Sequence, residues 1–235
     1  MEMEAFMNPI KSIQNLSRFE KTLWITSLLV IAISYFSVDN NNYMTVITSL
    51  VGATALIFLS KGDALGQFLS IVFALLYAIV SFQCRYYGEM ITYLGMTLPS
   101  ALVAMINWLR HPYTEREVEI SHVSRKKWVF LCISSVFVTV LLGFVLKYFG
   151  TANLLFSTIS VTTSYFACML TIFRSPYYAI AYSFNDVVLI ILWVLATIEN
   201  VCYLPMILCF LVFLANDIYG FVNWRIMAKR QARGK

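Results

Sequence analysis

Two pairs of neighbouring polar residues, Asn185-Asp186 and Asn216-Asp217, interrupt long apolar runs in the second half of the chain. If the runs are helices, each Asp lies about two turns, or about 12 Å, inside its run. A central Asp in a membrane-spanning helix costs about 2.5 to 3.5 kcal/mol on insertion scales, and neither run has a Lys, Arg or His in its core to neutralise the charge. Because unpaired carboxyls at such depth usually face a water-filled path, we expect both Asp side chains to do so.

Aromatic, amide and hydroxyl side chains accompany these carboxyls. Tyr182, Asp186 and Trp193 recur at helical spacing on one stripe. Aromatic faces next to hydrogen-bonding groups suit a flat heterocycle that carries a hydroxylated sugar, so the pattern favours a nucleoside-like or vitamin-like solute. The candidate substrate-binding residues are Gln67, Tyr77, Thr158, Thr162, Tyr165, Tyr182, Asn185, Asp186, Trp193, Asn216, Asp217 and Tyr219.

Other chemistries find little support in the sequence. The only histidines, His111 and His122, lie between apolar runs, the five cysteines lack metal-ligand spacing, and no phosphate-binding Gly-rich loop is present, so we expect no cofactor and no metal. Hydroxyls and amides in membrane helices can also be packing groups, and we interpret Asn107 and Asn223 as structural. An intramembrane aspartyl enzyme built on Asp186 and Asp217 is an alternative, but neither follows a Gly-x-Gly sequence.

The composition indicates an all-α integral membrane protein. Of 235 residues, 60% are hydrophobic and 12% are charged, whereas an average soluble domain has about 25% charged residues. The net charge of +5 comes from short basic clusters beside apolar runs, so it does not indicate binding of nucleic acid. Because a spanning helix needs about 20 mostly apolar residues, we expect about eight spans, at residues 22–37, 43–60, 66–84, 88–109, 128–147, 152–173, 178–198 and 203–225.

The distribution of basic residues predicts the topology. With alternating loops, all of the 17 Lys and Arg residues except Arg85 and Lys147 fall on one side, which is the cytoplasmic side by the positive-inside rule. Both termini are then cytoplasmic. The predicted parts are an N-terminal segment (1–21), a first helical half (22–109), a linker (110–127), a second helical half (128–225) and a basic tail (226–235). We interpret the linker as solvated, and Trp24, Trp108, Trp128 and Trp224 as interfacial anchors.

An internal repeat is visible when the sequence is shifted by 116 residues. The shift matches Asn107-Trp108 to Asn223-Trp224, together with several apolar residues of the preceding spans. Spans 2 to 4 then correspond to spans 6 to 8 in the same orientation, because the offset is four helices. The predicted architecture is a 1+3+1+3 parallel repeat, like that of SWEET-type sugar facilitators, with a path between the two halves.

The C-terminal sequence from Ala215 to Arg225 (ANDIYGFVNWR), the Asn107-Trp108 copy and the 1+3+1+3 pattern resemble the PnuC family of bacterial vitamin and nucleoside transporters. The resemblance implies a full-length SWEET-like fold and a trimer in the bacterial cytoplasmic (inner) membrane. It also implies facilitated diffusion of nicotinamide riboside, which a cytoplasmic nucleoside kinase traps by phosphorylation.

One departure from the family's pattern leaves the substrate open. Nicotinamide riboside members have a Trp-x-x-Trp motif before an Asn that resembles Asn185, and this chain has Tyr178 to Ala181 (YAIA) at that place. Nicotinamide riboside and deoxynucleosides are therefore both expected substrates. Alternatives are thiamine or another vitamin, and a substrate-binding subunit of an ATP-driven importer.

Overall fold

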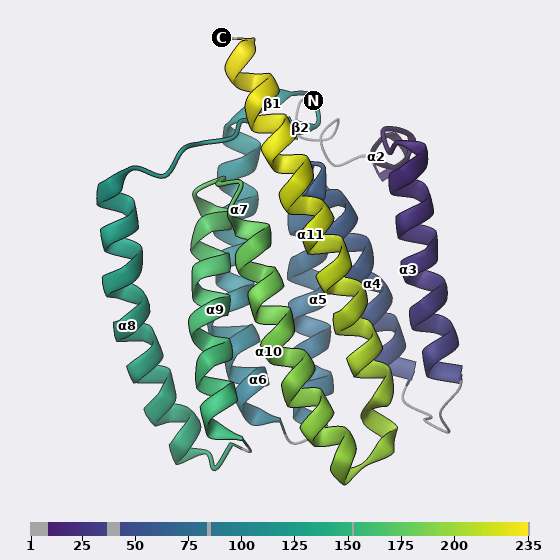
Figure 1. The fold of residues 1–235 in the computed structure, drawn as a ribbon, viewed down its shortest axis with the longest axis vertical. Coiled ribbons are helices and arrows are strands. Elements are labelled where there is room, and N and C mark those ends of the chain that lie inside the picture. Colours follow the sequence, from purple (N-terminus) through teal and green to yellow (C-terminus); the bar gives the residue numbers. More distant parts are fainter. Residues whose placement is uncertain (1–8, 37–42, 84–85, 152, 235) are drawn as a thin grey trace.

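The computed structural model describes residues 9–36, 43–83, 86–151 and 153–234, which are almost entirely helical (Figure 1). The helices are α2 (Pro9–Gln14), α3 (Arg18–Phe36), α4 (Tyr43–Ser60), α5 (Ala64–Gln83), α6 (Tyr87–Thr92), the π-helix η1 (Tyr93–Thr97), α7 (Leu98–Arg110), α8 (Arg125–Tyr148), α9 (Leu154–Ile172), α10 (Tyr178–Glu199), the 3-10 helix η2 (Val201–Tyr203) and α11 (Leu204–Arg233). A short hairpin pairs β1 (Pro112–Thr114) with β2 (Glu117–Val118) in antiparallel fashion.

Within the described residues, eight helical segments are long and apolar enough to cross a membrane, as the sequence predicted. Their ends differ from the predicted ones where polar residues continue or cap a helix. At the start of α3, Ser17 and Glu20 form a reciprocal capping box, so the helix begins before the apolar run. The predicted basic tail is not a separate segment, because α11 continues to Arg233. Residue 37, the last of the first predicted span, lies outside the described residues.

The outer helices differ from the central ones in burial. Helices α8 and α3 lie at opposite edges of the bundle (Figure 1), and only 17% and 28% of their most apolar windows are buried. The other spans pack around the centre, where α4 pairs with α5 and α10 pairs with α9 and α11. Residues that form the site therefore come from the central helices.

One glycine and one proline shape the central helices. A Cβ atom on Gly52 of α4 would lie 2.5 Å from Cζ of Phe213 and 2.9 Å from the ring of Phe73, so only glycine leaves room for both rings. On the fourth span, the π-helical turn η1 ends two residues before Pro99, which lacks the N–H of a regular helix. The sequence predicted one regular helix here. The wider turn displaces the side chains of Tyr93 and Thr97 from the positions of a regular α-helix.

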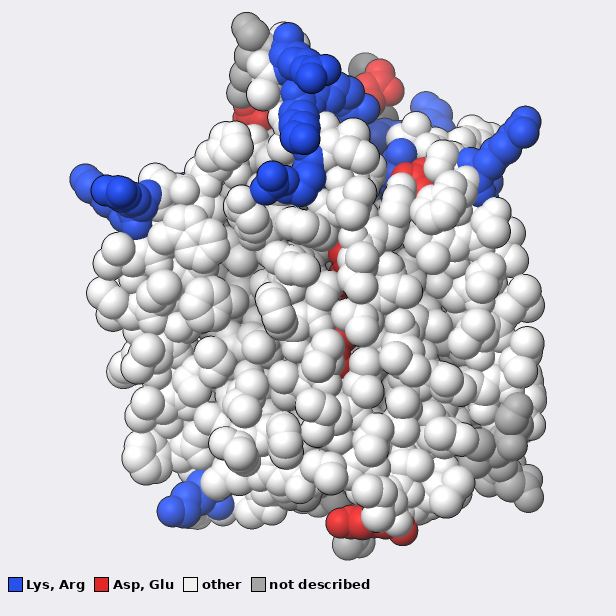
Figure 2. Space-filling view, viewed as in Figure 1, with Lys and Arg blue, Asp and Glu red and all other residues white. Residues whose placement is uncertain are grey.

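Most Lys and Arg side chains visible in Figure 2 gather at the end of the molecule where α11 terminates, which we call the basic end. We call the opposite end the far end. The basic end includes the start of α3, the turns that follow α4 and α9, and the 111–124 segment that carries the hairpin.

The 111–124 segment is joined to the basic end by hydrogen bonds and does more than connect the two halves, although Val118 is its only buried residue and the others are at least partly exposed to solvent. Val118 is fully buried, and its N–H donates to the carbonyl of Gly62. The side chain of Gln231 on α11 accepts from the N–H of Ile120 and donates to the carbonyl of Val118. Further along, the N–H of Ser121 donates to the carbonyl at position 174. The segment therefore joins the turns after α4 and α9 to the end of α11.

Two Asn-Trp pairs exchange hydrogen bonds between the helical halves. Asn223 and Trp224 of α11 donate to the carbonyls of Ser60 and Leu59 at the end of α4, at 2.8 and 2.9 Å. Asn107 and Trp108 of α7 donate in the same way to the carbonyls of Ile172 and Thr171 at the end of α9, at 2.6 and 3.0 Å. The structural interpretation of both Asn residues is thus confirmed.

The two tryptophans of these pairs are not interfacial anchors as predicted. Trp108 and Trp224 are fully buried, and their ring centroids lie 5.3 Å apart. Tyr178 packs against Trp224 with a centroid distance of 4.7 Å. An anchor would expose part of its ring to the membrane surface, whereas these rings close the centre of the bundle at the basic end.

Candidate functional site

A cavity of about 60 Å³ lies in the centre of the bundle, lined by residues of α4, α5, η1, α9, α10 and α11. Its polar lining groups are Ser70, Thr97, Ser164, Asn185, Asp186 and Asp217. Small-molecule pockets have volumes of about 300 Å³ or more, so a drug-sized ligand would need the surrounding helices to move apart. The structure is therefore a closed state of this site.

The two carboxyl groups predicted to face a water-filled path both line this cavity. Asp186 and Asp217 are 3% and 4% exposed, and each lines the cavity from its own helix. Helices α10 and α11 pack against each other, so the two carboxyl groups lie on neighbouring helices of one cavity. No Lys, Arg or His takes part in the lining formed by the described residues, so no cation there balances a charge on the pair.

Asn185 is held in place by hydroxyls of α9. Its Oδ1 atom accepts hydrogen bonds from Thr163 and Ser164, both at 2.9 Å. Because both bonds use the carbonyl side of the amide, the NH₂ group remains the hydrogen-bond donor that a ligand in the cavity can meet. The hydroxyls of α9 thus position this donor.

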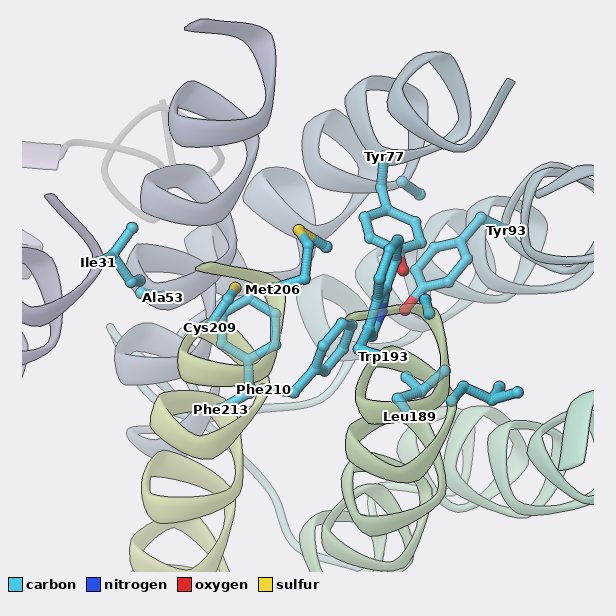
Figure 3. Close-up of a cluster of buried hydrophobic side chains, with 13 residues drawn as sticks. Ile31, Ala53, Tyr77, Tyr93, Leu189, Trp193, Met206, Cys209, Phe210 and Phe213 are labelled. Carbon is cyan, nitrogen blue, oxygen red and sulfur yellow. The ribbon is translucent and has the colours of Figure 1, made fainter. Parts of the chain in front are cut away.

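Aromatic rings form the remaining walls of the cavity, including those of Phe73, Tyr93, Tyr182, Phe210 and Phe213. Figure 3 shows that Tyr93, Phe210 and Phe213 belong to one cluster of buried side chains with Tyr77 and Trp193. Tyr77 lies 4.3 Å from Tyr93 and 6.2 Å from Phe210, measured between ring centroids. This cluster closes the cavity toward the far end.

Trp193 lies two helical turns beyond Asp186 and does not line this cavity. Its ring packs against those of Tyr86 and Tyr203, at 5.0 and 5.6 Å, and it lines a smaller cavity of about 10 Å³ together with Glu89. Trp193 was predicted to pack against the ring of the substrate. In this closed state it does not line the central cavity.

Asn216 and Tyr219 point toward α3 rather than into the cavity. The Asn216 amide donates to the hydroxyl of Ser27 at 3.0 Å and to the carbonyl of Val212 at 2.8 Å. The Tyr219 hydroxyl donates to Glu20 at 2.6 Å. These contacts attach α3 to α11.

The other predicted residues also lie away from the cavity lining. The hydroxyl of Thr162 lies 2.8 Å from that of Thr139 on α8, and the hydroxyl of Thr158 donates to the carbonyl of Leu154. Gln67 and Tyr77 are buried elsewhere in the bundle, and Tyr165 packs in the cluster near the basic end. The structure thus brings together four predicted residues, which are Tyr182, Asn185, Asp186 and Asp217.

Sequence reasoning missed several lining residues. Ser70 corresponds to Asp186 under the 116-residue shift, so the repeat could have pointed to it. Tyr93 and Thr97 lie on the π-helical turn, a feature that often marks functional sites, and Pro99 was its only signal in the sequence. Phe210 and Phe213 resemble any other apolar residue of a membrane helix.

Within the described residues, eight helices that could span a membrane surround a small cavity with aromatic walls and a few polar groups, which is the arrangement of a multi-pass membrane transporter. Residues 42–226 match the family described as nicotinamide mononucleotide transporter, and the chain belongs to this family. The membership places it among transporters rather than enzymes, and it confirms the resemblance drawn from the sequence.

Two curated relatives and one solved structure are similar over most of the chain. The nicotinamide riboside transporter PnuC of Neisseria mucosa is 25% identical over 90% of this chain and 83% of the relative. The Haemophilus influenzae protein of the same name is 21% identical over 89% of this chain and 91% of its own length. A crystal structure of the vitamin B3 transporter PnuC superposes with a TM-score of 0.80 at 24% identity, covering 92% of this chain and 94% of that chain. This last likeness shows a shared fold.

Proposed function

We propose that this protein transports nicotinamide riboside across a membrane, with the central cavity as its binding site. The single observation that carries the proposal is the composition of the cavity, in which aromatic walls surround one amide and two carboxyl groups. Aromatic rings suit the nicotinamide ring, and the polar groups suit the carboxamide and the ribose hydroxyls. The names of the two curated relatives support the same substrate.

The charge of the cavity favours the riboside over its phosphorylated form. Nicotinamide mononucleotide adds a phosphate, which proteins usually bind with Arg, Lys or backbone N–H groups. The described lining offers two carboxyl groups and no cationic side chain, so a phosphate there would meet repulsion and lose its hydration. We therefore assign the unphosphorylated nucleoside as the substrate.

Both ends of the cavity are closed by aromatic side chains, which supports transport by alternate opening. Leu59 lines the cavity, and its carbonyl binds Trp224, so the Trp108–Trp224 pair lies between the cavity and the basic end. The cluster of Tyr77 and Trp193 lies on the far side. Substrate would pass when one of these layers separates while the other stays packed.

The remaining parts of the proposal rest on the distribution of charge and on the family resemblance. We infer that the protein lies in a bacterial inner membrane with the basic end and both termini in the cytoplasm. Facilitated diffusion, trapping by a cytoplasmic nucleoside kinase, and a trimeric assembly follow from the resemblance. The parallel SWEET-like repeat stays a prediction, supported by the matching hydrogen bonds of the two Asn-Trp pairs.

A binding titration of the purified protein in detergent tests the substrate. The panel is nicotinamide riboside, nicotinamide mononucleotide, thymidine, deoxyadenosine, uridine and thiamine. We expect binding in the micromolar range for nicotinamide riboside and at least about tenfold weaker binding of the mononucleotide. Preferential binding of thymidine or deoxyadenosine would replace the proposed substrate with a deoxynucleoside.

A further inference from the structure

Asp186 and Asp217 bring two carboxyl groups together at the central cavity from different helices, α10 and α11. The two helices pack against each other, both residues line the same cavity, and both side chains are more than nine-tenths buried. The Oδ2 atom of Asp186 has no hydrogen-bond partner among the described residues. Asp186 therefore has one buried, unsatisfied acidic oxygen on a residue that lines the cavity.

The surroundings of this carboxyl pair contain no compensating cation in the part of the chain that the structure describes. The other titratable groups that face the pair are Tyr93 from η1, Tyr178 and Tyr182 from α10, and Cys209 from α11, all of types that are neutral at pH 7. Helices α4, α5 and α9 contribute only apolar and hydroxyl side chains to the cavity lining. A negative charge on the pair is therefore left for the ligand to balance.

Two carboxyl groups at one small, water-poor cavity do not both ionise, because like charges at short range repel strongly. At least one of the two carboxyls then keeps its proton, and the titration belongs to the pair rather than to either residue. Such a pair carries at most one negative charge. Removing either carboxyl leaves the other free to carry that charge alone.

We propose that the Asp186–Asp217 pair recognises the positive charge of the nicotinamide ring of the substrate. In nicotinamide riboside the ring nitrogen is bonded to the ribose, so the ring is a cation, whereas thymidine, deoxyadenosine and uridine are neutral at pH 7. Aromatic faces around the pair add to the attraction for a cation. The inference rests on the proposed function. It adds that the site selects nicotinamide riboside over neutral nucleosides by the charge of the solute.

The test compares nicotinamide riboside with its 1,4-dihydro form, which keeps the ribose and the carboxamide but has a neutral ring. Both are titrated at pH 7 against purified wild-type protein, Asp186→Asn, Asp217→Asn and the double variant. We expect the wild type to bind the cation at least about tenfold more tightly than the neutral form. Each single variant should keep this ratio within about threefold, and the double variant should lose it, because only the double variant lacks a charge.

The matched control is Glu89→Gln, a carboxyl-to-amide change of another buried residue that does not line the central cavity. It should leave the ratio unchanged. Equal binding of both forms by the wild type would overturn the inference even if the double variant does not fold, while leaving the proposed function intact. A double variant that keeps the ratio, or a single variant that abolishes it, would also overturn it. Binding of neither form by the wild type would reject the proposed function itself.

Discussion

Replacing Asn185 with Ala tests the cavity most directly, because this amide has a structural side and a ligand side. On the structural side, Thr163 and Ser164 lose their acceptor. Thr163 keeps hydrogen bonds to two backbone carbonyls, whereas Ser164 loses the acceptor that it has in the structure. One buried hydroxyl is then unsatisfied, which lowers the free energy of unfolding by about 1 to 3 kcal/mol.

On the ligand side, Asn185→Ala removes one neutral hydrogen-bond donor from the cavity. A bond of this kind contributes about 1 to 1.5 kcal/mol, so we expect about 5- to 12-fold weaker binding of nicotinamide riboside. The assay is a binding titration of purified protein in detergent, paired with thermal unfolding of the same samples.

Asn216→Ala is the matched control for this prediction. Its amide is equally buried and also bonds a hydroxyl, on Ser27, but it does not line the cavity. We expect it to lower the unfolding temperature and leave the affinity unchanged. The reasoning is refuted if both variants lose affinity equally, or if Asn185→Ala binds as tightly as the wild type.

Three further predictions concern the basic end. Trp224→Phe keeps an aromatic ring but removes the N–H that donates to the Leu59 carbonyl. That carbonyl still accepts a hydrogen bond from the N–H of Gly62 in the turn after α4. We expect a loss of about 1 kcal/mol, or about 2 to 4 °C in unfolding temperature, with a similar loss for Trp108→Phe. If only one of the two variants lowers the unfolding temperature, the two exchanged hydrogen bonds do not contribute equally to stability. Burial raises the pKa of Asp63, so the folded chain holds its proton at a pH where the unfolded chain has lost it. The unfolding temperature of the wild type minus that of Asp63→Asn should therefore fall as the pH rises from about 4 toward neutral. A difference independent of pH would contradict this. Gln231→Ala removes three of the side-chain hydrogen bonds that hold the 111–124 segment, so trypsin should cleave this segment several-fold faster than in the wild type. Unchanged cleavage would show that other contacts suffice.

Sequence reasoning located the spans and the depth of the two carboxyls because both depend on chemistry along one helix. The length of an apolar run sets a span, and the cost of an Asp in that run demands a polar path. Counting residues placed Asp186 and Asp217 at matched depth, and the structure has both at one cavity.

The rotation of each helix and the exact level of a side chain could not be derived in the same way. Consecutive residues point about 100° apart around a helix, so Asp217 can line the cavity while Asn216 faces α3. Trp193 shares a stripe with Asp186 but lies seven residues farther along, or about 10 Å. A stripe identifies a face of a helix, and only packing decides which level of that face meets the cavity.

Helix ends posed a different difficulty, because their partners lie far away in the sequence. Trp108 and Trp224 occur where interfacial anchors usually occur, next to Arg residues at the ends of spans. Their N–H groups bond carbonyls 63 and 165 residues away. No local pattern identifies such a partner, so both residues were misinterpreted.

The exchanged Asn-Trp bonds give the two halves of this single chain the contact pattern of a symmetric dimer. In an isologous interface, residue i of one copy meets residue j of the other, and j meets i. Here α7 of the first half caps α9 of the second, and α11 of the second caps α4 of the first. Neither half contains the side chains that cap its own second spanning helix, α4 or α9. Two fragments cut within the 111–124 segment would each lack the same cap, and each would regain it only from the other.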